Sequence, residues 1–250
     1  MMRLALVGKG GSGKSVIAGT LARLLARDHR PVLALDIDTL PGLAYSIGLG
    51  PISDAGLPED LAERREGQGW VLREPISAET LVDQYALAAP DGIQFLQLGK
   101  LPGHVRPGAV VAFRHVVESF RKDGWSIVGD LAAGTRQGFG GWAGFASLIA
   151  IVLEPTQAAA VSARRLSRLA ETVPAARLGI IVNKVTGRET HKPWESLDLP
   201  LWAALPFDAE VAEAERLGVA PVDYAPKAAA VAAIAELVPR LERLACQEVS

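Results

Sequence analysis

The chain has 250 residues, a formal net charge of −2, 49% hydrophobic residues and 22% charged residues. These totals indicate a globular protein with a buried core and exclude a disordered chain. The near-neutral balance gives no sign of binding to nucleic acid or to an anionic membrane through overall charge. Cys246 is the single cysteine, which excludes an internal disulfide and a multi-cysteine metal site within one chain.

The first apolar run begins directly after Met1, Met2 and Arg3, and this leaves no room for a signal peptide before it. No apolar run approaches the roughly 20 residues that a membrane-spanning helix needs. We therefore expect a cytoplasmic protein.

Strand and helix patterns alternate along the chain. Apolar runs at 4–7, 32–35, 93–98, 125–128, 148–153, 178–182 and 201–205 predict strands, and segments at 16–27, 109–121, 158–171 and 228–244 have helical spacing. Buried strands that alternate with helices predict an α/β fold with a doubly wound, mainly parallel sheet and helices on both faces. We expect a single domain over 1–250, in which the irregular stretch at about 51–90 forms an insertion of short helices.

A glycine-rich octet follows the first strand. It reads Gly8, Lys9, Gly10, Gly11, Ser12, Gly13, Lys14 and Ser15. This is the spacing of a phosphate-binding loop (P-loop), in which backbone N–H groups of residues without Cβ atoms can point at phosphate oxygens. Lys14 would reach the β- and γ-phosphates, Ser15 would offer its hydroxyl to Mg²⁺, and the helix start at Val16 would add its positive dipole end. The octet predicts a nucleoside triphosphate site.

Two carboxylates follow the second strand, in the order Asp36-Ile37-Asp38. Ligands in open parallel sheets bind beyond the carboxyl ends of the strands, so these side chains should face the bound triphosphate. There they can hold metal-bound water or orient the attacking water. The alternative is that an aspartate here shapes the turn or caps a helix.

Asp130 ends the fourth predicted strand and is followed by Gly134. An aspartate at this place can reach the Mg²⁺ shell, and a nearby flexible glycine lets a backbone N–H approach the γ-phosphate. After the sixth strand, the Asn183 amide can bind the adenine edge and the Lys184 stem can cover the ring, unless Asn183 is a turn residue. Thr186 stands where guanine-specific proteins carry an aspartate, which favours ATP over GTP.

Together, these motifs resemble those of the MinD/ParA/ArsA/nitrogenase-iron-protein ATPases, whose phosphate loop carries a second lysine at the position of Lys9. The resemblance implies a homodimer formed on ATP binding, in which Lys9 reaches the partner's phosphates and Asp38 positions the hydrolytic water. It also implies that the backbone at Pro206 and Phe207 reads the base. The implied ligands are ATP or ADP with Mg²⁺, and the implied activity is slow ATP hydrolysis in which Lys9, Lys14 and Asp38 are catalytic.

Within this superfamily the chain is most similar to the CooC type, which helps to insert nickel into carbon monoxide dehydrogenase. The matching segments are VGKGGSGKSVIAGTLARLLA, LALDID, DGIQFLQLGK, VGDLAAG, VLEPTQAAAVSARRLSRLA, IVNKV and LPFDAEVAEAERLGVAP. The Cys-x-Cys that joins two subunits of that type around a metal ion is missing, because residues 99–108 contain His104 but no cysteine. Delivery of nickel is therefore in doubt.

The resemblance leaves two biological roles open. One is a metalloenzyme maturation factor that acts on a protein client, and we favour it. The other is a positioning or partitioning ATPase that acts on DNA, membrane or a protein cargo. Membrane binding is unfavoured because the C-terminal helix has balanced charge and an internal proline, Pro239. DNA binding is unfavoured because Arg164, Arg165 and Arg168 form only one small basic cluster.

Overall fold

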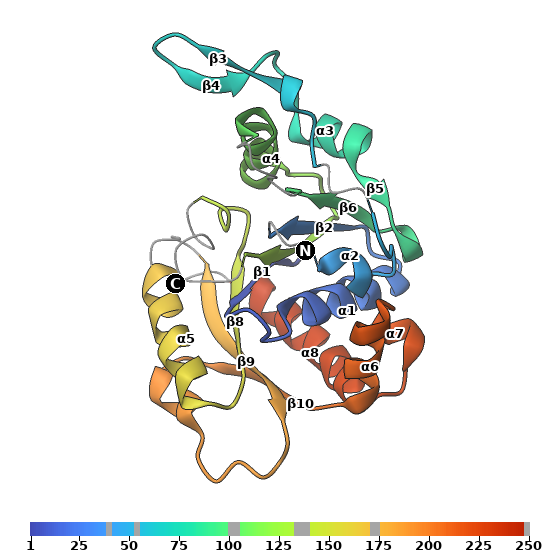
Figure 1. Cartoon of the computed structure of the whole chain (residues 1–250), viewed down its shortest axis with the longest axis vertical. Helices are drawn as coiled ribbons and strands as arrows, with labels where there is room; N and C mark the ends of the chain where they lie inside the picture. Colours follow the sequence, from blue (N-terminus) through green and yellow to red (C-terminus); the bar gives the residue numbers. More distant parts are fainter. Residues whose placement is uncertain (39–41, 53–55, 100–105, 133–140, 171–175, 248–250) are drawn as a thin grey trace.

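A computed structural model describes the chain apart from residues 39–41, 53–55, 100–105, 133–140, 171–175 and 248–250. Within the described residues, eight strands form one sheet: β1 (Arg3–Gly8), β2 (Val32–Ile37), β5 (Leu87–Ala88), β6 (Gln94–Gln97), β7 (Ser126–Leu131), β8 (Leu148–Leu153), β9 (Arg177–Val185) and β10 (Leu201–Pro206). Their order is β10-β9-β8-β1-β7-β2-β6-β5, and all neighbours run parallel except β5 and β6. Because β1 lies between β8 and β7, the residues after it leave the sheet near its middle (Figure 1).

Helices cover both faces of this sheet (Figure 1). On one face lie α1 (Lys14–Arg27), α2 (Leu43–Ser46) and α8 (Ala229–Cys246), and on the other lie α3 (Ala78–Tyr85), α4 (Pro107–Ser119) and α5 (Gln157–Ala170). The short helices α6 (Ala209–Leu217) and α7 (Pro221–Tyr224) pack beside α1 and α8. Short 3-10 helices are η1 (Glu59–Leu61), η2 (Pro90–Gly92) and η3 (Pro193–Leu197).

Two hydrophobic cores, one on each face, explain why the strands are apolar throughout. Along β1, Leu4 and Leu6 enter the core beneath α1, α2 and α8, whereas Ala5 and Val7 enter the core beneath α3, α4 and α5. Successive side chains of a strand point to opposite faces, so a strand covered on both sides has no solvent-facing position. The expected doubly wound, mainly parallel α/β fold is confirmed. None of the helices in the described part of the chain is long and apolar enough to cross a membrane.

The segment at 51–90 differs from the expected insertion of short helices. Its main feature is an antiparallel hairpin of β3 (Ala62–Arg65) and β4 (Gly69–Leu72), followed by the single eight-residue helix α3. Gly67 and Gly69 have φ angles of 74° and 78°, which glycine adopts easily and which turn the chain between the strands. Figure 1 shows this hairpin at one end of the molecule, above α4.

The hairpin is attached to the body at its base. The Arg73 N–H donates to the Leu61 carbonyl over 2.9 Å and closes the hairpin. Just before it, the Glu59 carboxylate accepts from the backbone N–H groups of Gly108 and Ala109, at 2.9 and 3.2 Å, in the first turn of α4. A carboxylate at this place satisfies free N–H groups and complements the helix dipole. The pairing was hidden in the sequence because β3 consists largely of charged residues.

Gly19 offers a test of the packing between α1 and α2. A Cβ atom at this position would lie 2.4 Å from Ser46 Cβ and 2.7 Å from the Ser46 carbonyl carbon. In an exposed helix, a Gly→Ala substitution raises the free energy of unfolding by about 1 kcal/mol. Here overpacking makes the same substitution destabilising. We expect Gly19→Ala to lower the free energy of unfolding by about 1–3 kcal/mol in urea titrations. Gly144→Ala is the control because a Cβ there would meet nothing within 4 Å; equal effects would contradict the packing.

Candidate functional site

The glycine-rich loop joins β1 to α1 with a backbone that only glycine adopts easily. Gly11 and Gly13 have φ angles of 80° and 91°, and Gly13 is the N-cap of α1. The Ser12 N–H donates to the Lys9 carbonyl over 3.2 Å and tightens the loop. At the loop's start, a Cβ on Gly8 would lie 2.3 Å from the Val152 carbonyl oxygen of β8. Backbone of this kind forms a concave nest of N–H groups, which binds anions.

The end of β9 holds this loop from the side. The Asn183 amide donates to the Ser12 carbonyl over 2.8 Å, and a Cβ on Gly13 would overlap the same amide nitrogen at 2.2 Å. The Lys184 ammonium donates to the Gly11 carbonyl and to Glu154 Oε1, both over 2.7 Å. Loop-holding contacts by these side chains were not part of the sequence interpretation. The contribution of Glu154, which directly follows β8, was missed entirely.

Two buried carboxylates lie side by side at the ends of β2 and β7. Asp36 pairs in register with Asp130, and their exposed fractions are 0% and 1%. The two oxygens of Asp36 accept from the backbone N–H groups of Asp38 and Leu43, both over 3.1 Å. Asp36 therefore bonds the backbone just after β2 and at the start of α2, in keeping with the alternative, left open by the sequence, that it shapes a turn or caps a helix. Asp38 itself is half-buried.

The electrostatics of this pair suit a bound cation. Burial and the neighbouring Asp130 charge raise the pKa of Asp36 to about 7. Burial also raises the pKa of Asp130 to about 6, against the opposing effects of the Lys14 charge and the Ser15 hydroxyl, which bonds Asp130. One oxygen of Asp130, Oδ1, has no hydrogen-bond partner among the described residues. A hydroxyl beside an unsatisfied buried carboxylate is the oxygen set that Mg²⁺ prefers.

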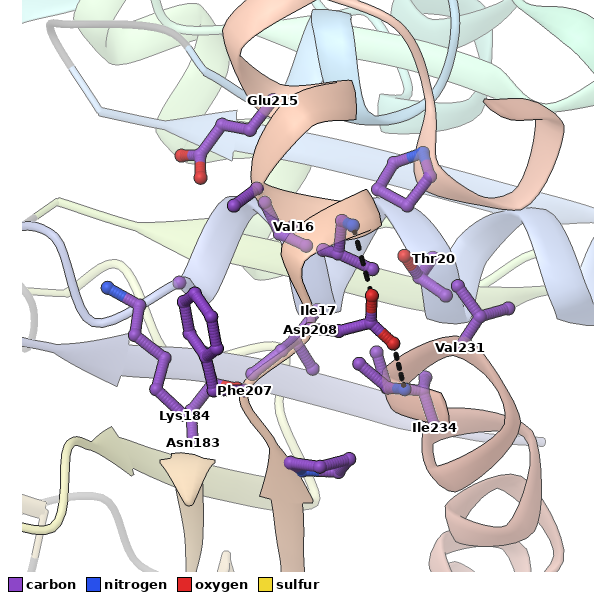
Figure 2. Close-up of a pocket in the computed structure, with 16 residues that line it drawn as sticks. Val16, Ile17, Thr20, Asn183, Lys184, Phe207, Asp208, Glu215, Val231 and Ile234 are labelled. Carbon is purple, nitrogen blue, oxygen red and sulfur yellow. Dashed lines mark hydrogen bonds between the residues drawn. The ribbon is translucent and has the colours of Figure 1, made fainter. Parts of the chain in front are cut away.

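A pocket lies beside the phosphate loop, between α1 and the α6–α8 segment. Figure 2 shows Lys184 and Phe207 together at one end of it, and Thr20, Val231 and Ile234 at the other. Its lining includes Gly13, Val16, Asn183 and Lys184 from the loop side, and Pro206 and Phe207 from the end of β10. Gly13 and Val16, at the end of the predicted phosphate loop, are thus brought together with the predicted base residues around one cavity. Apolar walls with a few polar groups are typical of a small-molecule site.

Asp208 organises the far wall of this pocket. Its Oδ1 accepts from the N–H groups of Glu210 and Val211, at 3.0 and 3.4 Å, and caps α6. Its Oδ2 accepts from Ala230 N at 3.3 Å and so joins α6 to the start of α8; Figure 2 shows its two bonds to pocket-lining residues. Asp208 was not among the predicted site residues, although an aspartate before a helical segment is a recognisable N-cap signal.

Two of the sequence-based expectations fall outside the described residues. They are the role of Gly134 near the γ-phosphate and the surroundings of His104, in the stretch where related proteins carry Cys-x-Cys. Lys9 and Gly10 are described and exposed on the loop, whereas Lys14 is 6% exposed and buried beneath it. The two loop lysines therefore stand in different environments, one turned to the surface and one to the interior.

Comparison with known proteins agrees with this geometry. A family model described as the CobQ/CobB/MinD/ParA nucleotide binding domain matches residues 4–222. The chain belongs to this family. Its membership confirms the resemblance drawn from the phosphate loop and the aspartate motifs, and it establishes a P-loop nucleotide-binding domain.

Two curated members of the family match along almost the whole chain. An ATP-binding protein of Methanocaldococcus jannaschii is 31% identical over 242 residues, which cover 91% of this chain and 93% of the relative. The carbon monoxide dehydrogenase accessory protein CooC of Rhodospirillum rubrum is 28% identical over 246 residues, 90% of this chain and 91% of CooC.

Among solved structures, the septum site-determining protein MinD of Pyrococcus horikoshii, complexed with Mg-ADP, superposes with a TM-score of 0.73. The match covers 98% of this chain and 97% of that one, at 19% identity. At this identity the likeness shows a shared fold.

The buried carboxylate pair predicts a pH-dependent effect of Asp130→Asn. Because both pKa values are raised in the folded state, the metal-free protein loses stability as pH rises from about 4 to 7 and the pair ionises. Removing one charge should therefore stabilise at pH 8 and matter little at pH 5, with a difference of about 1–3 kcal/mol. Urea unfolding in EDTA at both pH values measures this. A variant whose stability relative to the wild type is equal at pH 5 and pH 8 would contradict it.

Proposed function

We propose that the protein is a homodimeric switch ATPase that binds and slowly hydrolyses Mg-ATP and assists the maturation of a metalloenzyme. The observation that carries the nucleotide part is the phosphate loop, which has a buried Lys14 and a Ser15 hydroxyl on the half-satisfied carboxylate of Asp130. Family membership supports the same conclusion. The maturation part is supported by the near full-length similarity to CooC.

In this proposal the triphosphate lies against the loop Gly8–Lys14. Backbone N–H groups of Gly10, Gly11 and Gly13 bind its oxygens, together with Lys14 and the N–H groups that begin α1 at Ser15 and Val16, while the Ser12 N–H tightens the loop through the Lys9 carbonyl. Mg²⁺ fits the Ser15 hydroxyl, with Asp130, Asp36 and Asp38 reached through water, and supplies positive charge at the phosphate oxygens. The adenine base occupies the pocket between Lys184, Pro206 and Phe207, within reach of Asn183.

The hydrolytic step is the attack of water on the γ-phosphorus with cleavage of the bond to ADP. Asp38 accepts a hydrogen bond from this water and orients it, while Asp36 holds the backbone of Asp38 in place. Lys14 and Lys9 stabilise the charge that develops on the phosphate oxygens. We propose that the backbone N–H of Gly134 binds the γ-phosphate and that this glycine responds when the γ-phosphate is lost on hydrolysis.

The preference for adenine is supported at Thr186. Guanine-specific P-loop proteins carry a carboxylate at this position, but here the Thr186 N–H and hydroxyl both donate to Glu189 Oε1, at 2.6 and 2.8 Å. A threonine held in its own turn offers no carboxylate to the two N–H groups that distinguish guanine. We therefore propose ATP and ADP as the ligands.

The biological output depends on what each state of the dimer binds. A protein client, either a metalloenzyme or one of its assembly proteins, is the proposed partner, whereas DNA and membrane are unfavoured. The alternative is a MinD- or ParA-like positioning role, which the shared fold accommodates equally. Since the sequence has no Cys-x-Cys at 99–108, the proposal includes no metal ion shared between subunits.

The two loop lysines give the first test of this function. Lys14→Ala should weaken Mg-ATP binding at least about 100-fold, because it removes a buried charge partner of the phosphates. Lys9→Ala should bind Mg-ATP nearly as well as the wild type but fail to dimerise with it, as measured by light scattering after size exclusion. Lys192→Ala, an exposed lysine paired with Glu195, is the control. Tight ATP binding by Lys14→Ala would refute the phosphate-loop assignment, and an ATP-dependent Lys9→Ala dimer would refute the cross-subunit role.

Asp38→Ala tests both hydrolysis and the biological role. Without the water-orienting carboxylate, kcat should fall about 100-fold while ATP stays bound and the dimer persists. Asp28→Ala, which removes an exposed carboxylate, should hydrolyse normally.

A tagged Asp38→Ala dimer loaded with Mg-ATP should then capture its client from native extract, for identification by mass spectrometry. A captured metalloenzyme or assembly protein supports maturation. Captured DNA-segregation, scaffold or membrane components would move the protein to the positioning class, and normal turnover would place the water-orienting group elsewhere.

A further inference from the structure

The far wall of the nucleotide pocket has only a small core of its own. The α6–α8 segment packs around a cluster of five buried residues, three of which are alanines. They are Ala220, Val222, Ala225, Ala228 and Val231, with Leu24 of α1 packed against them. Alanine buries little apolar surface, so this cluster holds α6 and α7 to α1 weakly, whereas α8 also packs with Ile234, Leu237 and Leu241 in the larger core that it shares with α1. Something further has to fix the distance between the two walls.

The face of α1 that lines the pocket continues into two arginines. Thr20, Arg23 and Arg27 are spaced i, i+3 and i+7, and they therefore share one side of the helix. Thr20 lines the pocket, and Arg23 lies just beyond it with an exposed fraction of 3%. A buried guanidinium is costly unless it is fully paired.

Arg23 is paired on three sides. Its Nη1 and Nη2 donate to Asp223 Oδ2 and Oδ1, at 2.7 and 2.9 Å, in a bidentate pair with α7. Nη1 also donates to the Ile47 carbonyl at the end of α2, at 2.9 Å, and Nε donates to Asp91 Oδ2 at 2.6 Å. Arg27 adds bonds to Asp91, Asp223 and the Val222 carbonyl. We call these four charged residues the arginine clamp.

The backbone around the clamp is fitted to it. Gly48 has a φ of 88°, and a Cβ there would lie 2.9 Å from Arg23 Nη1 and 3.5 Å from Asp223 Oδ2. Asp91 has a left-handed φ of 61°, which aspartate tolerates better than most residues. Burial alone would raise the pKa of Asp91, but the hydrogen bonds from Arg23 and Arg27 lower it below its usual value. Asp91 therefore acts as a charged partner of the two arginines.

Within the clamp, Asp223 connects Arg23 to the wall of the pocket. Asp223 lies two residues after Pro221, which begins α7 and lines the pocket opposite Val16 and Thr20. Asp91 binds the same arginines but lies on η2, which contributes nothing to the lining. Resting on the proposal that this pocket holds the adenine base, we propose that Arg23 and Asp223 are positioning residues that set the width of the base pocket.

Asp223→Asn and Asp91→Asn form a matched pair for the test. Each substitution removes one carboxylate charge that pairs with Arg23 and Arg27, but only Asp223 lies on a helix that lines the pocket. Calorimetric titration with Mg-ADP and with Mg-tripolyphosphate separates base binding from phosphate binding. For Asp223→Asn we expect about ten-fold weaker Mg-ADP binding with tripolyphosphate affinity unchanged within about two-fold. For Asp91→Asn we expect both affinities to stay at the wild-type value.

A role limited to fold stability would give a different result. The two variants would then lose similar amounts in unfolding temperature and would bind Mg-ADP alike, which would overturn the positioning role. If Asp223→Asn fails to fold, Asp223→Glu keeps the ion pair but displaces α7 by one methylene, and it should show the same selective loss of Mg-ADP. A wild type that binds neither ligand would overturn the proposed function itself, which separates that failure from failure of the clamp.

Discussion

The shape of the phosphate-binding loop depends on hydrogen bonds to its carbonyl oxygens from a strand far away in the sequence. Asn183 and Lys184 bind the carbonyls of Ser12 and Gly11 across separations of 171 and 173 residues. With these carbonyls held outward, the N–H groups of the loop are free to face an anion. The arrangement requires β9 to lie two strands from β1 and requires glycine at position 13, where any side chain would displace the Asn183 amide.

The charged side chains at the two ends of α1 differ in how completely they are paired. At its first turn, the buried carboxylate of Asp130 meets Lys14 and Ser15, and one of its oxygens has no hydrogen-bond partner in the described part of the chain. At its last turns, two arginines meet two carboxylates in a closed network. Incomplete pairing costs stability and leaves room for a cation, whereas complete pairing fixes neighbouring segments in place. One helix therefore joins the incompletely paired carboxylate of the proposed Mg²⁺ site to a fully paired network of charges at its other end.

Much of the fold could be predicted because strands buried on both faces have a strong local signal. The runs around Leu4, Val32 and Leu148 all lie in sheet strands. The phosphate loop was equally visible because its glycines and lysines are adjacent in sequence. The hairpin at 62–72 was not, since its charged residues become strands only through pairing with each other.

The missed parts of the candidate site share one physical cause. The missed contacts join segments that lie far apart in the chain. They are the bond between Glu154 and Lys184, the bond between Asp208 and Ala230 N, and the arginine clamp. No local periodicity records such a contact, and each residue taken alone is an ordinary surface charge or helix cap. Asp36 shows the same limit at short range, because its position predicted support of the metal's water shell or of the loop but not which backbone groups, Asp38 and Leu43, it would bond.

The closed base of the hairpin has an evolutionary consequence. Because the bond from Arg73 to Leu61 brings the two ends of the hairpin together, the turn at its far end can be lengthened or shortened without moving the chain on either side. Insertions and deletions at this place leave the sheet and the phosphate loop unchanged. Members of this family can therefore differ in this appendage without a change in the nucleotide-binding domain, which makes the hairpin a natural place for different specialisations.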